Sequence, residues 1–287
     1  MCQDSYNMFD VRGRIAVVTG GGGVLCQRMA SDLAAQGMKI ALLDLRKDAA
    51  EAAAAHICKN GGRAIGLECN VLERDSLQQV CDEVIKAFGR IDVLINGAGG
   101  NNPRATTSKE RLFPEDLTAV AEELKTFFDL DPQGVQFVFN LNFLGTLLPT
   151  QIFGRVMAEQ EKGIVINISS MNAFRPLTKI PAYSAAKAAI SNFTQWLSTH
   201  MAPAGIRVNA IAPGFFLTDQ NRFLLTDEKN GDLTARGNTI IAHTPMGRFG
   251  EPEDLSGTLL WLVSDASAFV TGIVVPVDGG FSAFSGV

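Results

Sequence analysis

One tyrosine and one lysine have the spacing of a proton-transfer pair. Tyr183 and Lys187 are four positions apart, which on a helix puts both side chains on one face. Ser170 lies thirteen residues before Tyr183, at the end of an apolar run typical of a strand. A free phenol has a pKa of about 10, and a nearby ammonium favours its ionised form. Tyr183 could therefore exchange a proton with a substrate oxygen while Ser170 hydrogen-bonds that oxygen and Lys187 lowers the pKa of the phenol.

A tyrosine and a lysine at this spacing also occur by chance as a surface pair. Two features of the sequence favour the functional interpretation. The chain has only two tyrosines, and a glycine-rich loop lies upstream in a matching order.

Four consecutive glycines, Gly20 to Gly23, follow the apolar run RIAVVTG and precede a segment of helical period. In this context glycine backbone can approach a pyrophosphate at a helix N-terminus, although a simple flexible turn has the same composition. Asp44 closes the next apolar run, where a carboxylate can bind both hydroxyls of a ribose and repel a 2′-phosphate. The glycine loop and Asp44 together predict a nicotinamide dinucleotide, and Asp44 favours NAD over NADP. Arg46 could instead bind a 2′-phosphate, and Asp44 could instead cap the helix that begins near Lys47.

Short apolar runs alternate with longer segments of helical period, as in a parallel sheet with crossover helices. The first three helical segments should end at Gly37, Gly62 and Gly89. We predict seven strands, at residues 14–19, 39–44, 63–69, 91–96, 163–169, 207–211 and 273–277. This pattern predicts one α/β domain over residues 1–287.

Two stretches are longer than ordinary connections between these elements, at about residues 100–135 and 215–248. In a doubly wound sheet, ligands bind beyond the carboxyl ends of the strands, and long connections there tend to be functional. We therefore expect an insertion at the first stretch and a lid over the substrate at the second.

The composition excludes several classes of protein. The 287 residues are 46% hydrophobic and 19% charged, and 25 basic against 30 acidic residues give a net charge of −5. No basic stretch supplies the positive surface that nucleic acid requires, so we expect no nucleic-acid partner. The odd cysteine count, the lack of a C-x-x-C pair and three scattered histidines predict no disulfide framework and no metal site. No apolar run approaches a membrane span and the N-terminus lacks a signal-peptide pattern, so we expect a soluble, cytoplasmic protein without a membrane partner.

Over nearly its whole length the chain resembles the short-chain dehydrogenases/reductases. The segments VVTGGGG, NGAG, NLNF, ISS, YSAAK, APGFFLT and VDGG occur in that family's order and spacing. The resemblance implies a three-layer α/β/α, doubly wound parallel sheet of seven strands, the Rossmann fold, and a homotetramer. It implies a catalytic tetrad of Asn142, Ser170, Tyr183 and Lys187, in which the Asn142 backbone anchors a water that relays protons to Lys187.

The same resemblance implies the residues that hold the cofactor. Residues 96–99 should pack beside its adenosine side, and Pro213, Gly214 and Thr218 should meet the nicotinamide carboxamide. The full set is Gly20, Gly22, Gly23, Val24, Leu25, Asp44, Leu45, Asn70, Val71, Asn96, Gly97, Ala98, Tyr183, Lys187, Pro213, Gly214, Phe216 and Thr218.

The chain departs from the family's pattern at three of its positions. Val24 and Cys26 replace the second and third glycines of T-G-x-x-x-G-x-G, which adds bulk near the pyrophosphate and where helix meets strand. Asn70 stands where the family usually has an acidic residue beside the adenine. These changes bear on cofactor affinity and leave the tetrad intact.

Within the family, GAGGNNPRATT, the insertion after it and FNLNFLGTLLPTQ resemble D-mannonate oxidoreductases, which interconvert D-mannonate and D-fructuronate with NAD(H). A sugar acid needs a basic residue for its carboxylate and amides for its hydroxyls. Arg104 and Arg175 are candidates for the carboxylate, and each could instead be a surface charge or a subunit contact. The full set of candidate substrate residues is Asn101, Asn102, Arg104, Asn172 and Arg175.

Other functions fit the same sequence. The substrate could be a 3-oxoacyl thioester, the gluconate/5-ketogluconate pair or a polyol, although the amide-rich GNNPR segment argues against an acyl chain. Asn102 could serve only to fix the conformation of its loop. A nucleotide-binding protein without catalysis is the alternative from another class, and Val24 and Cys26 are its only support.

Overall fold

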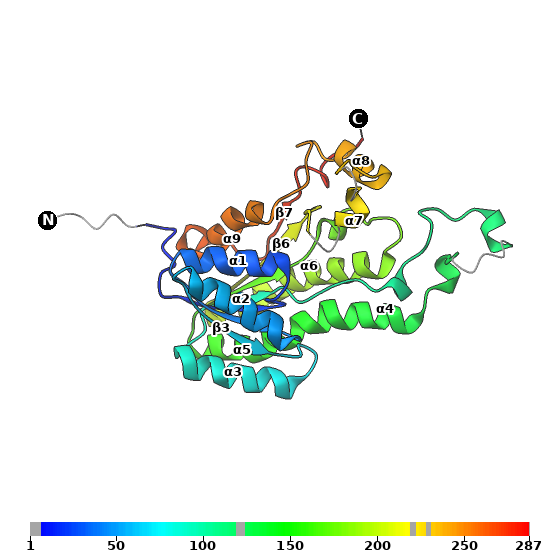
Figure 1. The fold of residues 1–287 in the computed structure, drawn as a ribbon. Coiled ribbons are helices and arrows are strands. Elements are labelled where there is room, and N and C mark those ends of the chain that lie inside the picture. The colour runs from blue at the N-terminus through cyan, green and yellow to red at the C-terminus, as the bar shows by residue number, and fades with distance from the viewer. Residues whose placement is uncertain (1–6, 119–123, 219–221, 228–230, 287) are drawn as a thin grey trace.

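Seven parallel strands form one twisted sheet between two layers of helices (Figure 1). The computed structural model describes residues 7–118, 124–218, 222–227 and 231–286. The strands are β1 (Ile15–Thr19), β2 (Lys39–Asp44), β3 (Arg63–Glu68), β4 (Val93–Asn96), β5 (Gly163–Ile168), β6 (Ile206–Pro213) and β7 (Val274–Val277). Each predicted strand is present within two residues of its expected bounds, and the three-layer, doubly wound parallel sheet is confirmed.

The strand order across the sheet is β3-β2-β1-β4-β5-β6-β7. The chain adds β2 and β3 on one side of β1 and β4 to β7 on the other, so the strand order reverses between β1 and β4. These two parallel strands are neighbours, and their register pairs Val17 with Leu94 and Thr19 with Asn96. A sheet of this order has a crevice beyond the carboxyl ends of its strands at the reversal point. The glycine loop after β1 and the turn after β4 both open into it.

Helices cover both faces of the sheet. On one face lie α1 (Val24–Ala35), α2 (Lys47–Lys59) and α9 (Ser256–Val263), and on the other lie α3 (Arg74–Phe88), α5 (Gly145–Glu159) and α6 (Pro181–Met201). The central strands β1, β4 and β5 are buried on both faces, so they read as nearly continuous Val and Ile runs rather than as alternating ones. Alternate β1 residues enter opposite cores, Val18 packing with Met29 and Val17 with Phe153.

Each of the first three helices is followed within two residues by a glycine in the left-handed region. Gly37 and Gly89 have φ values of +86° and +89°, as predicted helix ends require. After α2 the prediction is off by one residue: Gly61, with a φ of +85°, makes the turn and Gly62 follows it.

One long helical segment crosses the site in three parts. The helix α4 (Pro132–Phe139) runs through a π-helical turn (Asn140–Leu144) into α5. Asp131 begins it by accepting a hydrogen bond from the Gln133 N–H at 2.9 Å. The extra residue of a π turn changes which face of the helix meets the site.

The two long connections behave differently from ordinary loops. Residues 101–118 and 124–131 form an arm of short 3-10 turns that projects from the body (Figure 1), and the Thr107 N–H donates a hydrogen bond to the Lys179 carbonyl at 2.9 Å. The second connection carries α7 (Arg222–Leu225) and α8 (Ala235–Ala242) above the carboxyl ends of the strands. Parts of the predicted insertion and lid, residues 119–123, 219–221 and 228–230, lie outside the described residues.

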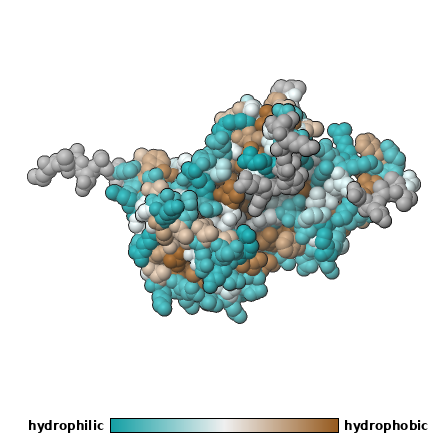
Figure 2. All heavy atoms as spheres, in the orientation of Figure 1, coloured by the Kyte–Doolittle hydropathy of each residue, from teal (hydrophilic) through white to brown (hydrophobic). Residues whose placement is uncertain are grey.

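The surface in this orientation is hydrophilic over most of the outer helices. In Figure 2 hydrophobic residues gather near the middle of this face, between the main body and the segment that carries α7 and α8. Among the described residues, no helix is both long enough and apolar enough to cross a membrane.

Candidate active site

Three of the four predicted catalytic residues line one cleft. Ser170 lies just beyond the end of β5, while Tyr183 and Lys187 lie one turn apart in the first half of α6. The cleft has a volume of about 470 Å³ and opens at the carboxyl ends of the strands. The Lys187 Nζ lies 5.6 Å from the centre of the Tyr183 ring and donates a hydrogen bond to the Ile168 carbonyl at 2.8 Å. The sequence spacing therefore brings an acid, a hydroxyl and an ammonium together.

Burial shifts the pKa values of both members of the pair. It raises the pKa of the Tyr183 phenol, and a hydrogen bond from Ser170 partly opposes that rise. It lowers the pKa of Lys187 from 10.5 to about 8. Within this structure the group that opposes the rise in the phenol pKa is Ser170, whereas the sequence leads us to expect this effect from Lys187.

Asn142 lies in the π-helical turn and holds the loop after β4. Its side-chain amide donates to the carbonyls of Gly100 at 2.7 Å and Val138 at 2.8 Å. Gly99 fills the gap to the lysine, because a Cβ there would lie 2.7 Å from the Asn142 Oδ1 and 3.3 Å from the Lys187 Nζ. The fourth predicted tetrad residue therefore lies across Gly99 from Lys187, although it does not line the cleft itself. Its backbone carbonyl accepts a hydrogen bond from the Thr146 hydroxyl at 2.8 Å.

A buried polar chain beneath the cleft was not predicted. The Asn96 amide donates to Thr150 and to Asn167, both at 2.9 Å, and the Asn167 amide donates to Thr194 at 2.9 Å. These bonds join β4 and β5 to α5 and α6, so they fix the helix that carries Tyr183. An asparagine inside the apolar run GIVINI was the available sequence signal for Asn167. Asn96 itself is 1% exposed and lies below the cleft, rather than beside a cofactor as the resemblance implied.

The glycine loop and α1 form the other end of the cleft. Gly20 has a φ of +66°, and a Cβ there would lie 3.0 Å from the Ala98 backbone. Gly23 precedes the first turn of α1, whose N–H groups have no partner within the helix. Asp44 accepts hydrogen bonds at 3.0 Å from the Gly22 N–H and the Arg46 N–H. These residues fit a dinucleotide, because the first turn of α1 offers N–H groups to a phosphate and Asp44 presents a carboxylate at the cleft edge.

The departure at Cys26 is accommodated by the turn after β4. A Cβ on Gly97 would overlap the Cys26 Sγ, so the missing side chain at position 97 makes room for the thiol. Burial raises the pKa of this thiol to about 12. Cys26 is thus a packing residue of the cofactor end, and Val24 lines the cleft at the start of α1.

Most of the predicted cofactor residues line this one cleft. Those that do are Gly20, Gly23, Val24, Leu25, Asp44, Gly97, Ala98, Tyr183, Lys187, Pro213, Gly214, Phe216 and Thr218. Gly22, Leu45, Asn70, Val71 and Asn96 are not among its lining residues, and Gly22 acts through its bond to Asp44. The cleft also includes Gly99, which the resemblance places beside the adenosine. Its remaining lining residues are outside the predicted cofactor set: Cys26, Met29, Gly100, Ile168, Ser169, Phe215 and Leu255.

The candidate substrate residues after β4 are engaged in their own loop. The Asn101 amide donates to the Thr106 hydroxyl at 3.0 Å, and the Asn102 Oδ1 accepts the Arg104 N–H at 2.9 Å. Arg104 forms an ion pair with Asp131. Asn102 therefore has the loop-fixing role that the sequence left open.

The two candidates after β5 differ in burial. Asn172 is 5% exposed, and its Oδ1 has no hydrogen-bond partner among the described residues. Arg175 is exposed, and its Nε donates to the Ser282 carbonyl at 3.1 Å.

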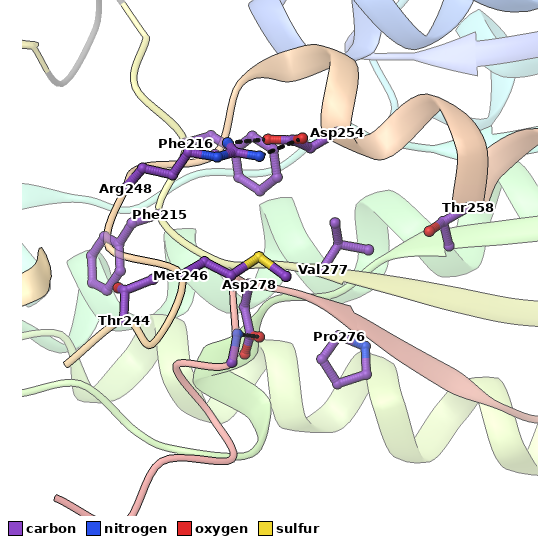
Figure 3. Close-up of a pocket in the computed structure, with 13 residues that line it drawn as sticks. Phe215, Phe216, Thr244, Met246, Arg248, Asp254, Thr258, Pro276, Val277 and Asp278 are labelled. Carbon is purple, nitrogen blue, oxygen red and sulfur yellow. Dashed lines mark hydrogen bonds and ion pairs between the residues drawn. The ribbon is translucent and has the colours of Figure 1, made fainter.

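A second cavity of about 400 Å³ adjoins the cleft and shares Phe215 and Phe216 with it (Figure 3). Two hydrogen bonds, at 2.6 and 2.9 Å, hold the Arg248 guanidinium to the Asp254 carboxylate at one end of this cavity. Met246, Asp278 and Val277 form other parts of its wall. Among the described residues, no group of three or more His, Cys, Asp or Glu side chains could hold a metal ion.

Comparison with known proteins identifies the family. The family model of the short chain dehydrogenases matches residues 14–229, and the chain belongs to this family of oxidoreductases that act on alcohol groups. It is 54% identical to an uncharacterized oxidoreductase of Haemophilus influenzae over 97% of this chain and 96% of that protein. It is 50% identical to the uncharacterized oxidoreductase UxuB of Bacillus subtilis over 97% of this chain and 98% of that protein.

A solved structure is also similar along the whole chain. It is that of a proposed D-mannonate oxidoreductase from Haemophilus influenzae with bound NAD. The two chains are 53% identical with a TM-score of 0.90, and the match covers 97% of this chain and 98% of that one.

Proposed function

We propose that the protein transfers hydride reversibly between NAD(H) and a secondary alcohol or ketone of a sugar acid, D-mannonate and D-fructuronate being the pair we favour. The observation that carries the proposal is one cleft lined by Ser170, Tyr183 and Lys187 at one end and by the glycine loop at the other. The likeness to a proposed D-mannonate oxidoreductase with bound NAD supports the choice of substrate.

In the direction of reduction, the Tyr183 hydroxyl donates its proton to the ketone oxygen. Burial raises the pKa of Tyr183, which keeps the phenol protonated and ready to donate. Ser170 hydrogen-bonds the same oxygen as it gains negative charge. The bound nicotinamide supplies the hydride to the carbonyl carbon, so the ketone gains one hydride and one proton. In the direction of oxidation Tyr183 takes the proton back, and the nearby Lys187 ammonium stabilises the phenolate.

Asp44 is the basis for preferring NAD. Its carboxylate lines the cleft at the end of β2, on the side where the adenosine ribose of a dinucleotide would lie. A 2′-phosphate there would meet this negative charge. Arg46 is tied to the same carboxylate through its backbone N–H rather than by its side chain.

The substrate is tested by following NADH oxidation with D-fructuronate, acetoacetyl thioester and 5-ketogluconate in parallel. We expect turnover of D-fructuronate to exceed that of the other two. If D-fructuronate is inert while another substrate is turned over quickly, the specific substrate is wrong and the reaction class stands.

The reaction class is tested with Tyr183→Phe. This variant should lose at least about a hundredfold in kcat, since it lacks the transferred proton, while its NADH affinity stays within a fewfold of the native one. Activity that survives the substitution would refute the mechanism. A native protein that binds NADH but reduces none of these substrates would favour a nucleotide-binding role without catalysis.

We also propose that the protein is a homotetramer of the cytoplasm. Exposed Trp196 on α6 and Leu144 at the start of α5 offer apolar surface for a subunit contact. Light scattering on the purified protein measures the oligomeric state directly.

A further inference from the structure

Residues 278–284, which follow β7, fold into a defined turn that we call the C-terminal turn. The Asp278 carboxylate accepts the N–H groups of Gly280 and Ser282, both at 2.9 Å. Gly279 and Gly280 have φ values of +63° and +89°, which other residues rarely adopt. These bonds fix the position of the Ser282 carbonyl relative to the end of β7.

The C-terminal turn contacts two segments that border the cleft, the one after β6 and the loop between Ser170 and Tyr183. The Phe281 ring packs edge-on against Phe215 with centroids 5.2 Å apart, and Phe215 lines the same cleft as Tyr183. On the other side, the Ser282 carbonyl accepts a hydrogen bond from the Arg175 Nε at 3.1 Å. Figure 3 shows the base of this arrangement, with Phe215 near Thr244 and with Asp278 at the end of β7. The turn therefore connects Phe215, just after β6, to Arg175 in the loop between Ser170 and Tyr183.

Three arginines lie on segments that border the cleft or the cavity beside it, and they differ in what neutralises their charge. Arg248 holds Asp254 through both ends of its guanidinium, and Arg104 is paired with Asp131. Arg175 differs from both, because it is bound to the uncharged Ser282 carbonyl and no carboxylate among the described residues forms an ion pair with it. Its two terminal nitrogens thus remain for a ligand, and the side chain is exposed.

We propose that Arg175, positioned by the C-terminal turn, binds the carboxylate of the substrate. Anchoring the Nε leaves the two terminal nitrogens to form the paired hydrogen bonds that a guanidinium makes to a carboxylate. Because the anchor is a neutral carbonyl, the full positive charge stays available to the substrate. The inference rests on the proposed function, since it requires an acidic substrate.

The test compares D-fructuronate with its uncharged primary amide, using the ratio of the two kcat/KM values. Arg175→Gln should lower this acid-to-amide ratio by about 10- to 100-fold, mainly through a higher KM for the acid, because one charge-assisted contact is lost. Arg175→Lys keeps the charge and loses the paired geometry, so its acid-to-amide ratio should lie between those of the native protein and of Arg175→Gln. NADH affinity should not change in either variant.

Arg155→Gln is the matched control. Arg155 is an exposed arginine of α5 that is paired with Glu159, and removing it should leave the ratio unchanged. Asp278→Ala removes both acceptors that hold the C-terminal turn and should raise the KM for the acid about 3- to 10-fold with kcat unchanged, since it loosens the anchor of Arg175 rather than removing it. Circular dichroism checks that each variant is folded.

The outcomes separate this inference from the proposed function. If the native protein turns over sugar acids and Arg175→Gln leaves the acid-to-amide ratio unchanged, the inference is wrong and the proposed function stands. A fall in the ratio for Arg104→Gln instead of Arg175→Gln would assign the carboxylate to the other arginine. If the native protein turns over no sugar acid, the proposed function and the inference both fail.

Discussion

Lys187 has a buried charge that should make the folded protein less stable at neutral pH. The side chain is 4% exposed, and burial lowers its pKa from 10.5 to about 8. Between these two values the unfolded chain binds the proton more tightly than the folded one does. The free energy of unfolding should therefore rise as the pH rises from about 8 to 10.5, and below pH 8 the full penalty, about 3 kcal/mol, applies.

The substitution Lys187→Met removes this charge and keeps a flexible side chain of similar length. It also removes the hydrogen bond to the Ile168 carbonyl, which costs about 1–2 kcal/mol. The net effect at pH 7 should be a variant that is about 1–2 kcal/mol more stable than the native protein and inactive. Near pH 9.5 most of the lysine's penalty has gone, so the advantage should disappear or reverse.

Urea unfolding without cofactor, at pH 7 and at about pH 9.5, measures the difference between the two chains. Lys86→Met, at an exposed position of α3, controls for the loss of one lysine without burial. A stability difference between Lys187→Met and the native protein that stays constant over this pH range would refute the reasoning. The reasoning would also be refuted if the stability of Lys187→Met relative to the native protein were lower at pH 7 than at pH 9.5.

Three more predictions come from other contacts. Asp44→Ala removes the charge that would repel a 2′-phosphate, so the preference for NADH over NADPH in kcat/KM should fall by at least about tenfold. Thr150→Val leaves the buried Asn96 amide without one acceptor, and urea unfolding should show a loss of about 1–3 kcal/mol. Gly99→Ala places a methyl group 2.7 Å from the Asn142 Oδ1, which should cost about 1–3 kcal/mol of stability and lower kcat; an unchanged kcat would contradict the placement of Asn142 beside Lys187.

The parts that were predicted well depend on neighbouring residues in the chain. Each strand is a short, mostly apolar run, and Tyr183 and Lys187 are held together by one helix, so local patterns were sufficient. The glycine loop is likewise one short segment between a strand and a helix.

The parts that were missed depend on contacts across the chain. Asn96 and Asn167 are 71 residues apart and meet only because β4 and β5 are neighbours in the sheet. Arg175 and Ser282 are 107 residues apart. The sequence offered Arg104 and Arg175 as equal candidates, because an ion pair between Arg104 and Asp131 has no local signature.

Asn142 lies in the π-helical turn at Asn140–Leu144. Its position therefore depends on the number of residues in this turn as well as on their types. Successive residues of an α-helix are rotated by about 100°, so deleting one residue within this turn would join α4 and α5 into a regular helix and rotate α4 by that angle relative to α5. Both helices could form, yet Asn142 and Val138 could not both keep their present partners. A single-residue deletion here should therefore impair the protein more than most substitutions in the same segment, which makes this turn a point where chain length is constrained.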